Sequence, residues 1–271
     1  HAMSACATGG FSTKNASIGY FDSPLIEWIL IVVMFLSSLH FGLIYSTFAR
    51  KANNIFRSEV VRTYVVIIAL ATLFVAASLY FTGVYTNALT SLRQSVFQVV
   101  SLITTTGFAT ADTNLWTPFA IVVLIIVSII CGCAGSTSGG VKVDRVLLYA
   151  KVLKARLRGQ QHPKAVFRIR LDGIVQDDRQ VNTTTLFITT YFVLILLGTL
   201  SSTLFGMDML TAFSSSVSFV SNVGPGFGEV GSLNNYAEIP VILKIQGSIL
   251  MLRGRLEIFG FIQFLFIRMW R

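Results

Sequence analysis

The feature of this sequence that most constrains its fold is an alternation of long hydrophobic segments with short ones that end in glycine-bearing loops. The long segments cover about residues 25–48, 64–81, 118–130, 185–205 and 239–267. Several of them reach the ~20 residues that a helix needs to cross a bilayer, whereas the short segments, 95–103 and 210–220, cannot cross. Of the 271 residues, 54% are hydrophobic and only 12% are charged, which excludes an ordinary soluble domain. We therefore predict an all-α polytopic membrane protein.

The charged residues lie mainly between the hydrophobic segments. Lys and Arg number 21 against 12 Asp and Glu, a formal net charge of +9. Because this charge flanks the segments, we interpret it as a determinant of topology and predict no nucleic-acid partner. The densest basic stretch, 142–179, is the predicted cytoplasmic loop. It could bind anionic membrane lipid, bind a cytosolic protein, or only enforce topology.

Three loops take the same place in successive units of the chain. They can be aligned on Gly9, Gly107 and Gly224, and we call them the first, second and third glycine loops. Each follows a short apolar segment and precedes a long one, so the chain reads as two whole repeats and the second half of an earlier one. A single such loop is typical of a tight turn, but three in register indicate a common purpose.

Irregular backbone at membrane depth is tolerated only where protein buries it or where it lines a wet cavity, so the repeated loops predict a pathway. A ring of backbone carbonyls can replace the hydration shell of a cation. The short helices would add the negative ends of their dipoles. The hydroxyls of Thr8, Thr105 and Thr106 could also face the ion, or could serve only the turns.

Five segments, 4–13, 104–108, 132–142, 222–226 and 254–259, resemble the Trk/Ktr superfamily of potassium-uptake proteins, and most closely the bacterial Trk pore-forming subunits. They occur in the family's order and span nearly the whole chain. The family has four unequal repeats, each with two spanning helices around a pore helix and a filter loop. The resemblance implies that residues 1–57 end the second repeat, 58–158 form the third, 159–184 are a basic cytoplasmic connector and 185–271 form the fourth. Residues 1–5 resemble the end of a pore helix, which favours an N-terminal truncation over a tag remnant.

The resemblance implies uptake of K⁺ across the bacterial inner membrane by a non-enzymatic pore without a cofactor, with K⁺ held at the filter carbonyls. It implies a homodimer and cytosolic, nucleotide-binding regulatory subunits of the TrkA kind. A Na⁺-permeable or ion-coupled relative stays open, because the family's first filter loop is not in this sequence. The implied filter residues are Thr8, Gly9, Gly10, Thr105, Thr106, Gly107, Phe108, Asn222, Val223, Gly224 and Pro225.

A stretch rich in glycine and serine interrupts the span that begins near Pro118. In the family the similar stretch is an intramembrane loop beneath the filter that obstructs the ion; close packing of helices through small residues is the alternative. The implied gate residues are Gly132, Cys133, Ala134, Gly135, Ser136, Thr137, Ser138, Gly139 and Gly140. The nearby cysteines, and Cys6, are expected to be small packing residues rather than metal ligands.

Three charges, Arg253, Arg255 and Glu257, fall in the middle of the last hydrophobic segment, where each costs a few kcal/mol if it faces lipid. Arg255 matches the family's barrier arginine under the filter; a structural ion pair is the alternative. Residues two apart do not share a helix face, so Glu257 is a poor partner for Arg255. Arg253 and Glu257 are four apart and could pair, but the purpose of Arg253 is unexplained.

Two other classes of function compete with transport. A membrane enzyme could use Ser136 or Thr137 as a nucleophile, but it would need a buried base, and His1, His40 and His162 are not placed to supply one. A packing or assembly protein without transport would leave the midplane charges and the three glycine loops unexplained.

Overall fold

The protein is described here by a computed structural model that places residues 1–49, 55, 57–162 and 168–255. The prediction of an all-α protein is confirmed for this part of the chain, in which the only strands are two of two residues each that form one hairpin. The helices are α1 (Ala2–Cys6), α2 (Pro24–Ser37), α3 (Phe41–Phe48), α4 (Glu59–Phe81), α5 (Ala88–Ile103), α6 (Pro118–Ile130), α7 (Val143–Gln161), α8 (Asp178–Leu204), α9 (Met209–Ser221) and α10 (Val241–Arg255). The hairpin is β1 (Arg170–Leu171) and β2 (Ile174–Val175), and short 3-10 helices cover Ser17–Phe21, Thr113–Leu115 and Gly228–Val230.

Several of these helices have a polar N-cap residue whose side chain accepts hydrogen bonds from the first backbone N–H groups. The side chain of Asn87 accepts from the N–H of Leu89 at 3.0 Å, and that of Thr117 from Ala120 at 3.2 Å. Asp208 accepts from two N–H groups at the start of α9, at 3.0 and 3.1 Å. Such caps satisfy donors that a helix cannot satisfy itself. The hydrogen bond with the Thr211 side chain, followed by the backbone bonds, lowers the pKa of Asp208.

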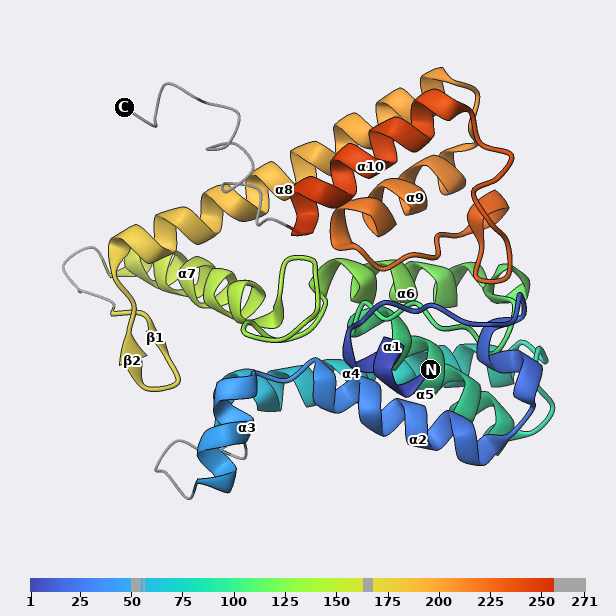
Figure 1. Ribbon diagram of the computed structural model, residues 1–271. Coiled ribbons are helices and arrows are strands. Elements are labelled where there is room, and N and C mark those ends of the chain that lie inside the picture. The colour runs from blue at the N-terminus through green and yellow to red at the C-terminus, as the bar shows by residue number, and fades with distance from the viewer. Residues whose placement is uncertain (50–54, 56, 163–167, 256–271) are drawn as a thin grey trace.

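The helices pack as a repeated arrangement. The short helix α5 packs against the long helices α4 and α6, and α9 packs in the same way against α8 and α10. The remaining short helix, α1, packs against α2. Figure 1 shows α8 and α10 side by side along one edge of the molecule, α2 at the opposite edge and α6 between them.

Among the described residues, α4 and α8 are each long and apolar enough to cross a membrane. The segment predicted as one span over residues 25–48 is instead two helices, α2 and α3, that meet at an angle of 95°. The two pass the length and hydropathy test only when they are taken together. Hydropathy alone counts apolar residues and does not detect such a bend.

The bend between α2 and α3 is stabilised by hydrogen bonds to a distant segment, residues 131–142. The carbonyl oxygen of Ser38 accepts from the N–H of Cys133 at 3.0 Å, and the N–H of Phe41 donates to Gly135 at 3.2 Å. In a continuous helix these groups would bond within the helix. The incoming segment therefore satisfies backbone groups that the bend releases.

The β1–β2 hairpin is fastened to the start of α4. At its turn, Asp172 accepts from the Ser58 hydroxyl at 2.8 Å and from the N–H of Glu59 at 2.5 Å. Lys151 on α7 donates to the Glu59 carboxylate at 2.5 Å and to the carbonyl of Arg170 at 2.7 Å. These bonds join the basic connector to the N-terminal end of α4.

Candidate ion pathway

The three glycine loops follow the C-terminal ends of α1, α5 and α9 with one shared backbone path. Each loop begins with a non-glycine residue in the left-handed region and reaches a left-handed glycine two residues later. The first positions are Thr8, Thr105 and Asn222, with φ of 51°, 57° and 58°; the second are Gly10, Gly107 and Gly224, with φ of 63°, 81° and 106°. Left-handed backbone is uncommon without glycine, so its recurrence at three threonine or asparagine positions marks a common structure.

The shared backbone path gives an alignment of the first loop that differs by one residue from the alignment made on the sequence. We aligned Gly9 with Gly107 and Gly224 from the sequence, but the residue with the matching geometry is Gly10. An ideal Cβ on Gly10 would lie 2.0 Å from the carbonyl oxygen of Thr106, and one on Gly107 would lie 2.3 Å from that of Val223. The three loops therefore approach one another closely in space, and the left-handed glycines make this approach possible.

A serine on the last turn of each short helix was missed in the sequence. The carbonyl oxygens of Ser4, Ser101 and Ser218 each accept from the N–H five residues later, at 2.8, 3.0 and 3.0 Å. Their hydroxyls bond the loop as well: Ser4 accepts from Phe11 at 2.9 Å, Ser101 donates to the carbonyl of Phe108 at 2.6 Å, and Ser218 accepts from Gly224 at 3.1 Å. The signal was the spacing Ser-x-x-x-Thr/Asn-x-Gly, which occurs in all three loops.

The interruption predicted at residues 132–140 is a non-helical loop between α6 and α7, which we call the 131–142 loop. Its two ends meet, because the N–H of Val141 donates to Ile129 at 3.3 Å and that of Lys142 donates to Ile130 at 2.9 Å. Inside the loop, Ser136 donates to the carbonyl of Cys133 at 2.6 Å. The chain thus leaves the axis of α6 and returns to nearly the same point before α7 begins.

The 131–142 loop contacts all three glycine loops at their left-handed first positions. The Thr8 hydroxyl donates to the carbonyl of Thr137 at 3.0 Å, and the Thr105 hydroxyl accepts from the N–H of Gly139 at 3.1 Å. At the third loop, an ideal Cβ on Gly139 would lie 2.2 Å from the carbonyl oxygen of Ser221 and 3.4 Å from Cβ of Asn222. One loop therefore closes the side of the convergence on which the short helices end.

Arg255, at the end of the described part of α10, also reaches this loop. Its Nη1 donates to the carbonyl oxygen of Thr137 at 2.7 Å. The preceding residue, Gly254, lies close to the end of α9, since an ideal Cβ on it would be 2.0 Å from the carbonyl oxygen of Val220. A cavity of about 200 Å³ between the loop and this arginine is lined by Lys142 and Arg145 as well. The predicted pairing of Arg253 with Glu257 lies outside the described residues.

The structure gives protein partners to each of the threonine hydroxyls that could have faced an ion. Those of Thr8 and Thr105 bond the 131–142 loop, and that of Thr106 bonds the side chain of Thr104 at 2.8 Å. The Phe108 side chain is fully buried in an apolar cluster rather than lining a pathway. These side chains of the glycine loops are therefore engaged within the protein.

Two of the three cysteines, Cys131 and Cys133, are packed inside the protein, whereas Cys6 is not. All three are reduced. The described residues contain no cluster of three or more His, Cys, Asp or Glu side chains that could hold a metal. The hydroxyl of Thr137 donates to the carbonyls of Cys6 and Ser37, at 3.2 and 3.3 Å.

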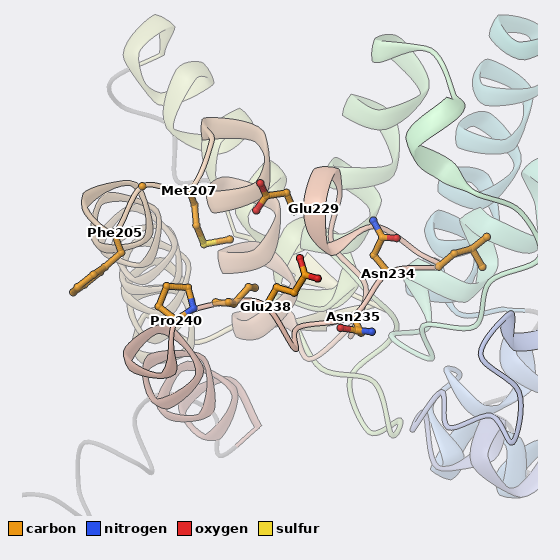
Figure 2. A pocket seen from close by; sticks show the side chains of 10 residues that line it. Phe205, Met207, Glu229, Asn234, Asn235, Glu238 and Pro240 are labelled. Atoms are coloured by element: carbon orange, nitrogen blue, oxygen red, sulfur yellow. The ribbon is translucent and has the colours of Figure 1, made fainter.

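A sizeable pocket lies away from this convergence. It measures about 620 Å³, and its lining includes Met207, just before α9, and the carboxylates of Glu229 and Glu238 (Figure 2). It adjoins the start of α9, whereas the 131–142 loop contacts the end of that helix. Size alone therefore does not identify the pathway in this fold.

Both the sequence and the structure of this chain match known proteins over nearly the whole length of this chain. Residues 1–269 match the family described as TrkH, cation transport protein. The Trk system potassium uptake protein TrkH of Salmonella typhimurium is 35% identical over 272 residues, and that of Vibrio parahaemolyticus is 37% identical over 281 residues. In both cases all of this chain is covered, and 56% of the relative.

The crystal structure of the potassium transporter TrkH from Vibrio parahaemolyticus superimposes with a TM-score of 0.91 at 35% identity. The match covers 99% of this chain and 57% of that one, so the chain spans a little over half the length of these relatives. The family match, the identities and the superposition all agree with the membrane fold described above. This chain belongs to the TrkH family of cation transport proteins.

Proposed function

We propose that this chain is part of a K⁺-uptake pore in which the three glycine loops contribute carbonyl oxygens to a selectivity filter and the 131–142 loop closes the pathway beneath it. The observation that carries the proposal is the convergence of Thr8, Thr105 and Asn222, from three separate units, on that one loop. A structure of this kind has the symmetry of a pathway, with similar loops around a common centre.

The proposal takes K⁺ as the cargo because relatives of this chain are named potassium uptake proteins. The short helices end at the glycine loops, so the negative ends of their dipoles favour a cation there. Carbonyl oxygens held by left-handed backbone and by serine hydroxyls can replace the water of a hydrated ion. A Na⁺-permeable relative is the second candidate, and competition between the two ions separates them.

The gate is proposed to consist of the 131–142 loop and Arg255. A cation that leaves the glycine loops toward the ends of α5 and α9 meets this loop, the charge of Arg255 and the charges of Lys142 and Arg145 in the cavity behind it. Like charges in a poorly hydrated passage raise the barrier for a cation. Passage would require the loop to leave Thr8, Thr105 and Arg255.

The proposed pore is built from repeats. Residues 1–57, 58–158 and 185–271 are the end of one repeat and two further repeats, and 159–184 connect them on the cytoplasmic side of the bacterial inner membrane. We propose a homodimer in lipid, regulated by cytosolic nucleotide-binding subunits that act on the basic face. Catalysis at Ser136 gains no support, because its hydroxyl bonds the carbonyl of Cys133 and the hydroxyl of Ser138.

Growth of a bacterium tests the proposal in vivo. The full-length protein that carries this chain should restore growth, at low external K⁺, to a strain that lacks its own K⁺-uptake systems. A matched strain that carries Gly107→Val should not grow, since a side chain there meets the carbonyl of Val223. Equal growth of both strains would show that the glycine loops are not the filter.

A further inference from the structure

Tyr236 lies in the connection between the 3-10 helix Gly228–Val230 and α10, outside the residues assigned to the filter. Its hydroxyl donates to the carbonyl oxygen of Gly224, in the third glycine loop, at 2.8 Å. Its ring packs on that of Phe219 in α9, with the ring centres 5.3 Å apart. An ideal Cβ on Gly247 in α10 would lie 3.0 Å from the same phenylalanine ring. Tyr236 is therefore held in place by the helices that flank the third loop.

Gly224 is supported differently from its counterparts in the other two loops. Gly10 and Gly107 are in close contact with the backbone of a neighbouring loop, whereas an ideal Cβ on Gly224 would have no atom within 4 Å. Side chains fix Gly224 instead: the Ser218 hydroxyl accepts from its N–H at 3.1 Å, and Tyr236 donates to its carbonyl. At the left-handed glycine itself, the third loop thus has two hydroxyl partners, whereas the first and second loops have close backbone contacts there.

We propose that Tyr236 is a positioning residue that fixes the Gly224 carbonyl and thereby sets the preference of the pore for K⁺ over Na⁺. This inference rests on the proposed function of the glycine loops as a filter. A carbonyl oxygen has two lone pairs, so the bond from Tyr236 leaves one for an ion. A carbonyl that is held at a fixed distance cannot move inward to coordinate a smaller ion, whereas a released one can.

The chemistry of the tyrosine suits this role at every physiological pH. Burial raises the pKa of Tyr236 to about 12, so the phenol keeps its proton and remains a donor. The aromatic body fills the space beside Phe219 whether or not the hydroxyl is present. Tyr236→Phe therefore removes the hydrogen bond and retains the packing.

The test compares wild type with Tyr236→Phe in the full-length protein, reconstituted in liposomes, by uptake of radiolabelled Rb⁺ against unlabelled K⁺ or Na⁺ as competitor. Loss of a single hydrogen bond predicts that the ratio of Na⁺ to K⁺ inhibition constants falls about fivefold. Rb⁺ uptake and the thermal unfolding midpoint should stay near those of wild type. Tyr80→Phe, which removes the hydroxyl of a half-exposed residue in the last turn of α4, should leave the ratio unchanged.

Ser218→Ala removes the other hydroxyl at Gly224 and should lower the same ratio, which provides the test if Tyr236→Phe does not fold. An unchanged ratio in folded Tyr236→Phe protein would overturn the role of Tyr236 while the proposed filter stands. Wild-type uptake that K⁺ and Na⁺ inhibit equally would instead overturn the proposed filter, and the inference with it. The two failures are therefore distinguishable.

Discussion

The guanidinium of Arg255 and the backbone of Thr137 are joined by a hydrogen bond of 2.7 Å from Nη1 to the carbonyl oxygen. The same oxygen accepts from the hydroxyl of Thr8 at 3.0 Å. One carbonyl of the 131–142 loop therefore links the last described helix to the first glycine loop. In the proposed gate, this junction holds the 131–142 loop in its closed position.

Arg255→Ala should increase Rb⁺ uptake by reconstituted protein. The change removes both a positive charge beside the pathway and a charge-assisted hydrogen bond, a class worth about 1.5–3 kcal/mol, so an increase of about tenfold or more is expected. Arg156→Ala on the exposed face of α7 is the matched control and should leave uptake unchanged. Reduced or equal uptake in Arg255→Ala would contradict a barrier role.

Thr8→Val should also raise uptake, by a smaller factor. Valine has nearly the shape of threonine but cannot donate to the Thr137 carbonyl, and a neutral hydrogen bond contributes about 1 kcal/mol, or roughly fivefold. Thr13→Val, at an exposed position in the same segment, is the control. If both variants behave alike, the Thr8 contact does not restrain the loop.

Gly139→Ala should displace the 131–142 loop from the third glycine loop. An ideal Cβ there would lie 2.2 Å from the carbonyl oxygen of Ser221, which is closer than any real contact. We expect higher basal uptake and faster proteolysis within the loop. Gly159→Ala provides the comparison, since nothing lies within 4 Å of its added methyl group and alanine favours a helix. A loop as protected in Gly139→Ala as in wild type would exclude this effect.

Gly10→Ala and Gly9→Ala distinguish the two alignments of the first loop. Gly10 has a φ of 63° and lies against the carbonyl of Thr106, so alanine there should abolish selective uptake. At Gly9 the nearest atom is 3.1 Å away and belongs to the side chain of Phe11, which can move. Gly9→Ala should therefore retain most of the K⁺ preference. The opposite order of severity would restore the alignment on Gly9.

Hydropathy predicted the helices that depend on local sequence. The predicted span 64–81 lies within α4, which runs Glu59–Phe81, and the predicted span 185–205 corresponds to α8. The bend after Ser37 was not predictable in this way, because it depends on hydrogen bonds from the 131–142 loop, far along the chain. A local pattern does not contain that information.

The candidate site, like the fold, was predictable only where the local sequence carries the signal. The repeated glycines located the three loops, and the glycine- and serine-rich interruption located the 131–142 loop. The alignment of the first loop was wrong by one residue because Gly9 and Gly10 are adjacent, and the serines at positions 4, 101 and 218 would have resolved it. The partner of Arg255 is a backbone carbonyl, which carries no signature in the sequence.

The decisive measurement is selective Rb⁺ uptake by liposomes that contain the full-length wild-type protein. When Rb⁺ is supplied outside the liposomes and K⁺ is absent, we expect uptake well above that of empty liposomes. Low concentrations of K⁺ should inhibit this uptake, and the same concentrations of Na⁺ should not. Uptake no greater than in empty liposomes, or equal inhibition by K⁺ and Na⁺, would contradict a potassium filter built from the three glycine loops.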